Sequence, residues 1–143
     1  MATALALGPA LAHLLELPNK IGLPKDAYFT VQQIYAGWSL LGMLLMVQLL
    51  SIVAVILQAR DDSRLRILAT IALLCLVGAQ VLFWIFTFPA NTATANWTRQ
   101  PDNWEALRRQ WEYSHAAGAL LQIICMACLV LGALGDKRRL LSS

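Results

Sequence analysis

The chain has 143 residues, of which 59% are hydrophobic and only 13% are charged. This length predicts a single domain, residues 1–143, and the charged fraction is about half of the roughly 25% typical of a soluble domain. The net charge of +3 comes from basic residues in short clusters beside apolar runs. Such clusters do not form a stripe that could follow phosphates, so nucleic acid is excluded as a partner, and the lipid bilayer is the expected one.

Four apolar segments follow one another along the chain. The first, residues 1–17, contains His13 and Glu16 and is followed by Pro18. The other three contain long runs without charge and are placed at about residues 36–58, 67–88 and 113–135. A helix needs about 20 predominantly apolar residues to cross the hydrocarbon of a bilayer. We therefore predict an all-α fold, an integral membrane four-helix bundle.

The first segment has a second interpretation, as a signal peptide cleaved near Ala12, where small residues suit cleavage. However, no basic residue precedes Lys20, so the positively charged start of a signal peptide is missing. A retained helix is the preferred interpretation.

The connections predict how the helices are arranged. The second and third spans are joined by the short charged segment 60–64, so these helices must be antiparallel neighbours. A long polar stretch, residues 90–112, follows the third span. It predicts an outer polar loop and the start of a helix that continues through His115 into the last span.

Basic residues beside the helix ends predict the orientation. Arg60, Arg64 and Arg66 lie in or near the connection between the second and third spans, and residues 137–139 are basic at the end of the last span. In a chain that crosses four times, this connection and both termini share one side. The positive-inside rule places that side in the cytoplasm.

The polar residues of the first and last helices form the candidate site. His13, Glu16 and Lys20 are three and four residues apart and therefore share one helix face, and Trp111 and His115 have the same spacing on the last helix. The end of the first helix and the start of the last emerge on the same side of the bundle, so the two histidines are expected at similar depth. Ionisable groups at membrane depth are costly unless they are paired or face a cavity, which makes them candidates for function.

Three roles fit this cluster. In the first, His13 or His115 transfers protons and Glu16 sets the tautomer or accepts a proton, which requires no cofactor. In the second, these three residues bind iron or copper as two histidines and one carboxylate. In the third, the cluster only fixes helix packing. Arg108 can pair with Glu112 one turn later on the last helix.

Other polar residues inside the spans have alternative interpretations. Cys125 and Cys128 form a Cys-x-x-Cys pattern that serves either thiol exchange or, as we prefer because no charge is near, helix packing. Gln48, Gln80 and Gln122 each lie near the middle of a different span. They either bond one another across the core or line a cavity.

Four segments carry a resemblance to a known family. They are His13 to Lys20 (HLLELPNK), Gln33 to Trp38 (QIYAGW), Pro89 to Trp97, and Arg108 to His115 (RRQWEYSH). On these segments the chain resembles the anthrone-oxygenase-like family of small four-helix integral membrane proteins. Many bacterial members have no assigned function, and characterised fungal relatives oxidise polyketide anthrones to anthraquinones with oxygen.

The resemblance implies a membrane oxidoreductase, a monooxygenase acting on a small lipophilic aromatic, in a bacterial inner membrane. It implies that His13, Glu16 and His115 are catalytic. It also implies a set of substrate-binding residues: Asn19, Trp38, Asn91, Asn96, Arg108, Trp111 and Glu112. The alternative is a non-catalytic membrane subunit or lipophile-binding protein, a homo-oligomer or the partner of another protein, in which the cluster is structural.

Overall fold

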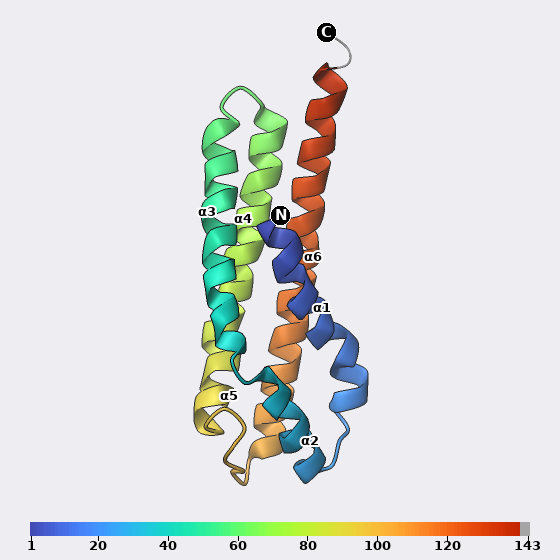
Figure 1. Cartoon of the computed structure of the whole chain (residues 1–143), viewed down its shortest axis with the longest axis vertical. Helices are drawn as coiled ribbons and strands as arrows, with labels where there is room; N and C mark the ends of the chain where they lie inside the picture. Colours follow the sequence, from blue (N-terminus) through green and yellow to red (C-terminus); the bar gives the residue numbers. More distant parts are fainter. Residues whose placement is uncertain (141–143) are drawn as a thin grey trace.

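The part of the chain that the structure describes is mostly helical (Figure 1). The structure is a computed structural model that describes residues 1–140, with side chains for residues 1–135. These residues contain no strand. The predicted all-α class is therefore confirmed for them. The main helices are α1 (Ala2–Lys20), α2 (Lys25–Gln32), α3 (Leu41–Gln58), α4 (Ser63–Leu82), α5 (Phe88–Ala93) and α6 (Trp104–Leu140).

Three helical segments of the described chain are long and apolar enough to cross a membrane. They are Trp38–Gln58, Ser63–Ala93 and Trp104–Gly135, and they correspond to the predicted spans 36–58, 67–88 and 113–135. The first predicted span is also helical, as α1, but it is not one of the three. Its polar residues, which include Glu16 and Lys20, lower its hydropathy. The apolar segments therefore indicate a membrane protein with three candidate spans.

The long helices run side by side (Figure 1). α3 and α4 form an antiparallel hairpin, and the side chain of Asp62 caps α4 by accepting a hydrogen bond from the Leu65 backbone nitrogen at 3.0 Å. α6 packs along α4, and α1 packs against both α6 and α3. The hairpin connection and the C-terminal end of α6 lie at one end of the bundle, whereas α2 and α5 lie at the other (Figure 1). The basic side chains of residues 137–139, used above for orientation, lie outside the described ones.

Two helices extend beyond what a bilayer requires. α6 is unbroken for 37 residues and passes through both Glu112 and His115, as predicted; at 1.5 Å per residue it is about 55 Å long. α4 continues into α5 through a π-helical turn at Phe83–Thr87. Such wide turns are rare and often lie at functional sites. Both extensions carry helical structure to the end of the bundle that holds α2.

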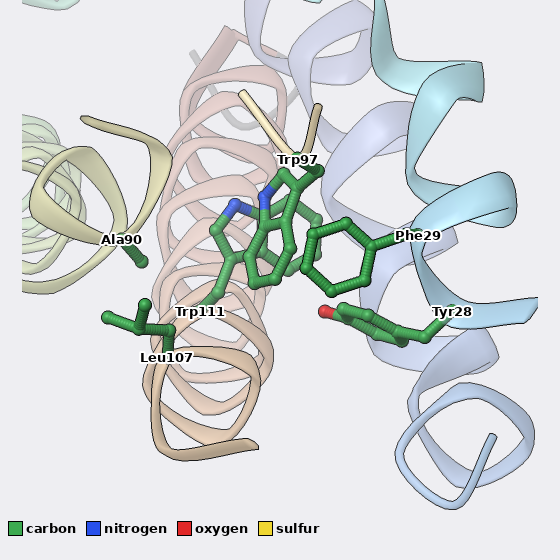
Figure 2. Packing of buried hydrophobic residues seen from close by; sticks show 6 residues of the cluster. All are labelled: Tyr28, Phe29, Ala90, Trp97, Leu107 and Trp111. Atoms are coloured by element: carbon green, nitrogen blue, oxygen red, sulfur yellow. The ribbon is translucent and has the colours of Figure 1, made fainter. Parts of the chain in front are cut away.

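The buried side chains form two clusters. One lies at the end that holds α2, and consists of Tyr28, Phe29, Ala90, Trp97, Leu107 and Trp111 (Figure 2). The other lies among α3, α4 and α6, and consists of Ile52, Ala72, Leu76 and Cys125, with Cys75 and Cys128 packed against it. All three cysteines are free thiols in or beside this apolar cluster. Their surroundings agree with the packing interpretation.

Both interpretations of the mid-span glutamines apply. Gln48 on α3 and Gln122 on α6 are buried and exchange two hydrogen bonds, with nitrogen to oxygen distances of 2.9 and 3.4 Å. Gln80 lines the cavity described below, and so does Gln122. An amide pair of this kind ties two helices together where lipid supplies no hydrophobic drive.

Because each amide satisfies the other, we expect Gln48→Leu and Gln122→Leu each to lower the free energy of unfolding by about 1 kcal/mol. Each single substitution leaves one buried amide unpaired. The double variant leaves none, so it should cost less than the sum of the two. Denaturant unfolding in detergent, followed by circular dichroism, measures this cycle, and strictly additive costs would show that the amides do not interact.

Candidate functional site

The two histidines of the chain meet inside the bundle. His13 on α1 and His115 on α6 stack with their ring centroids 4.1 Å apart and their ring planes inclined by 27°. They are far apart in the sequence and come together because α1 packs against α6 and runs in the opposite direction (Figure 1). The expectation that they lie at similar depth is confirmed.

Aromatic rings surround the histidine pair. The Trp111 ring centroid lies 4.1 Å from that of His115, and the Tyr35 centroid lies 4.7 Å from that of His13. Trp38 meets His13 edge-on at 5.4 Å. Aromatic side chains favour offset-stacked and edge-to-face contacts with other rings. The surroundings of the histidines therefore suit a planar aromatic ligand.

A cavity of about 1050 Å³ opens beside these rings. Ligand pockets typically have volumes of about 300–1,000 Å³, so this one is large enough for a small organic molecule. Its walls come from α1, α3, α6 and the π-helical turn after α4. The predicted site residues that line it are His13, Trp38, Asn91, Asn96, Trp111 and His115.

The remaining predicted site residues do not line the cavity. Asn19 is exposed on α1. Glu16 is partly exposed, whereas Arg108 and Glu112 are buried. Glu16, Arg108 and Glu112 each contact other protein groups. Glu16 and Glu112 belong to the ion-pair network described next.

A buried lysine links the polar residues of α1 and α6. The Nζ atom of Lys20, a residue only 3% exposed, lies 3.0 Å from Oε1 of Glu16 and 3.2 Å from Oε1 of Glu112. The same Glu16 oxygen lies 3.1 Å from Nδ1 of His13. The spacing of His13, Glu16 and Lys20 on one helix face predicts the contacts of Glu16 with Lys20 and with His13. Only the packing of α1 on α6 creates the contact of Lys20 with Glu112, and with it a chain of charges that ends at the histidine pair.

Two tyrosines donate to the carboxylates of this network. Tyr35 donates to Glu16 and accepts from Lys20 at 2.7 Å, whereas Tyr28 donates to Glu112 at 2.8 Å. Burial, together with the neighbouring carboxylate, raises the pKa of both tyrosine hydroxyls above the ordinary value. Both tyrosines therefore remain protonated donors at neutral pH.

The expected ion pair of Arg108 with Glu112 is wrong. Arg108 donates to the backbone oxygen of Leu23 at 2.7 Å, and its guanidinium carbon lies 4.6 Å from the Trp104 ring centroid. Lys20 is instead the basic partner of Glu112. The one-turn spacing allows the predicted pair, but contacts with α2 and the loop before it determine where each side chain points. Arg108 thus holds α6 to the segment after α1.

Asn91 positions the tryptophans of the cavity. Its Oδ1 atom accepts hydrogen bonds from the indole nitrogens of Trp97 at 3.1 Å and Trp111 at 2.9 Å. Figure 2 shows the two indoles beside each other, with the Tyr28 and Phe29 rings reaching toward them from α2. The three residues Ala95 to Trp97 all have positive φ angles, of 48 to 64°. This uncommon conformation costs about 1–2 kcal/mol per residue, and it turns the chain so that Trp97 is buried.

Three buried polar atoms in the described part of the chain have no hydrogen-bond partner. They are Oε1 of Gln32, Oε2 of Glu112 and Nε of Arg108. Gln32 donates from Nε2 to the Tyr28 hydroxyl at 2.5 Å, and Tyr28 donates onward to Glu112. This direction of donation fixes the Gln32 amide and leaves its oxygen as a free acceptor. Gln32 also lines the cavity.

Several residues of the site are not predicted from the sequence. Tyr28 and Gln32 carry no motif, although they are one turn apart and Gln32 is a polar residue before an apolar span. Tyr35 lies in the QIYAGW segment of the resemblance, but without a predicted role. Lys20 is recognised only as part of a polar stripe. Their roles arise from contacts between α1, α2 and α6, which sequence spacing within one helix does not encode.

The described residues contain no group of three histidine, cysteine or acidic side chains arranged to hold a metal ion. His13, Glu16 and His115 are the residues that the sequence suggests as metal ligands. The Glu16 oxygen nearest to His13 already contacts Lys20 and Tyr35.

Comparison with protein-family models, with curated proteins and with solved structures gave no match.

We expect Lys20→Met to lower the free energy of unfolding by about 3 kcal/mol, because it leaves the buried Glu112 carboxylate without its ion-pair partner. Adding Glu112→Gln should restore part of this loss. Chemical unfolding in detergent measures both effects.

Arg109→Met is the matched control, since Arg109 makes an exposed pair with Glu105 at 3.8 Å. Exposed pairs contribute about 0–1 kcal/mol. A loss for Lys20→Met no larger than that for Arg109→Met would contradict the role of Lys20 as the link between α1 and α6.

Proposed function

We propose that this chain is a multi-pass membrane oxidoreductase that oxidises a small lipophilic aromatic of the anthrone type. The observation that carries the proposal is the stacked pair of His13 and His115 beside an aromatic cavity of about 1050 Å³. In this proposal α1 also crosses the membrane, so that the bundle has four membrane-spanning helices. The cluster of Arg60, Arg64 and Arg66 is cytoplasmic, in a bacterial inner membrane, with both termini on that side.

The two histidines have different surroundings, which suits different roles. Nδ1 of His13 faces the Glu16 carboxylate at 3.1 Å, so a proton on Nδ1 would leave Nε2 as a base. His115 forms no hydrogen bond with any residue that the structure describes. Its ring nitrogens are therefore available to a ligand. Either ring can remove a proton from an acidic C–H group or phenol of the ligand.

The reaction that we propose uses oxygen as the oxidant. A histidine removes one proton from the CH₂ group of an anthrone, and the resulting electron-rich carbanion reacts with O₂ to form a C–O bond. The resulting peroxide anion takes up that proton to become a hydroperoxide. Removal of the second C–H proton then breaks the O–O bond, so that hydroxide leaves and is protonated to water, and a C=O group remains. The ring carbon is oxidised, one oxygen atom remains in the quinone and the other leaves as water. This is the stoichiometry of a monooxygenase, with both electron pairs supplied by the substrate.

The remaining cavity residues support binding of such a ligand. The rings of Tyr35, Trp38 and Trp111 offer aromatic contacts. The side chain of Gln32 also lines the cavity. Asn91 keeps two indoles in place. The site thereby combines planar apolar walls with a small number of polar side chains, as small-molecule sites do.

A non-catalytic lipophile-binding protein is the second candidate. The observation that favours it is the ion-pair network, in which Lys20 links Glu16 and Glu112 and so gives the acidic residues a packing role. In this case the histidines would only stack against each other and the ligand. The experiment below separates the two candidates.

We expect His13→Ala and His115→Ala to lower the turnover of a hydroxylated anthrone by at least about 100-fold, the usual contribution of a general base. His115→Phe is the matched control, because it keeps a ring beside His13 and Trp111 but removes the nitrogen atoms. It should be as inactive as His115→Ala. Added imidazole should restore activity to the alanine variant, which has an open space, and not to the phenylalanine variant.

Turnover is measured by oxygen consumption and anthraquinone absorbance in mild detergent, with metal analysis of the same protein. Wild-type activity in both alanine variants would overturn the proposed chemistry. Binding of the aromatic by a wild-type protein that gives no product would favour the lipophile-binding protein instead.

A further inference from the structure

A second hollow lies between α3 and α4. It is a groove of about 440 Å³ whose lining is apolar except for Gln80. Several of its side chains are exposed, among them Met46 on α3 and Val77 and Val81 on α4. These helices belong to two of the three segments that could cross a membrane. The groove therefore faces the hydrocarbon of a bilayer.

The groove adjoins the aromatic cavity. Both are lined by Gly42, Leu45, Gln80 and Trp84. A Cβ atom added at Gly42 would have no atom within 4 Å, so no side chain fills the space beside this shared residue. The cavity that holds the histidine pair and the groove on the hairpin thus have part of their walls in common.

We propose that this groove holds the hydrocarbon tail of a ligand whose aromatic head occupies the cavity. The natural ligand would then be an aromatic ring system that carries an alkyl or isoprenoid chain, and it would enter from the bilayer between α3 and α4. This inference rests on the proposed function, because it assigns the head to the same cavity. It adds the class of ligand and its direction of entry.

Three features favour the tail of a ligand over a bilayer lipid as the occupant of the groove. The lining of the groove is almost wholly apolar, which suits a chain without polar groups. Four of its ten lining residues also line the cavity. Gln32 on α2 and Asn91 on α5 line the cavity and not the groove, so polar contacts would hold the head in the cavity while a tail leaves it beside Gly42 and Leu45.

The test compares two probes: a dihydroxyanthraquinone, and the same ring system with a decyl chain. Their affinities are measured by quenching of tryptophan fluorescence at fixed detergent concentration. Met46→Trp on α3 and Val81→Trp on α4 narrow the groove without touching the cavity lining. Leu50→Trp and Leu74→Trp are the matched controls, since both positions are exposed on the same helices outside the groove.

We expect the wild-type protein and both controls to bind the two probes. The groove variants should bind the tailless probe as the controls do and the decyl probe about ten-fold more weakly. A photoreactive diazirine at the end of the chain should label peptides from α3 and α4. Two variants on different helices keep the test valid if one of them fails to fold.

The outcomes distinguish this inference from the function on which it rests. Failure of the wild-type protein to bind the decyl probe, or equal binding of it by groove and control variants, would overturn the tail assignment while the cavity assignment stands. In the latter case a bilayer acyl chain would be the occupant of the groove. Failure of the wild-type protein to bind even the tailless probe would overturn both proposals.

Discussion

The ammonium group of Lys20, held between two carboxylates, is the contact on which the candidate site depends. It joins Glu16 of its own helix to Glu112 of α6, and the Glu16 carboxylate in turn meets His13. A buried ion pair adds little net stability, because desolvation offsets most of the attraction. It does penalise arrangements that leave one charge unpaired. In this protein the pair of Lys20 with Glu112 forms where α1 packs on α6, as does the contact between the two histidines.

The bundle has an apolar region that holds the helices together and a polar, aromatic region that contains the candidate site. Among α3, α4 and the later part of α6, apolar side chains and the amide pair of Gln48 and Gln122 hold the helices together. Near α2, aromatic rings and hydrogen bonds to carboxylates dominate. The long α6 belongs to both regions and carries Trp111 and His115 at their border. Residues of the polar cluster can therefore be substituted without altering the apolar part of the bundle.

The cavity and the groove together suggest how a reactive lipophile could be handled. Its ring would face the histidine pair, while a chain would lie toward the bilayer between α3 and α4. Exclusion of bulk water around a carbanion prevents side reactions, and oxygen dissolves readily among apolar groups. In the proposed function, the largely apolar lining of the cavity serves both requirements. The strained turn at Ala95 to Trp97 closes one wall of it.

The sequence by itself determined the helical class, the three long apolar segments, the antiparallel hairpin at residues 60–64 and the continuous helix through His115, because these depend on composition and on spacing within one helix. It also determined that His13, Glu16 and Lys20 share a face. Only the tertiary structure decided that Lys20 is the partner of Glu112, that Tyr28, Gln32 and Tyr35 belong to the site, and that Asn19 lies outside the cavity. The physical reason is that a side chain with several partners in reach takes the one that packing between helices brings closest, and spacing along a single helix cannot supply that geometry.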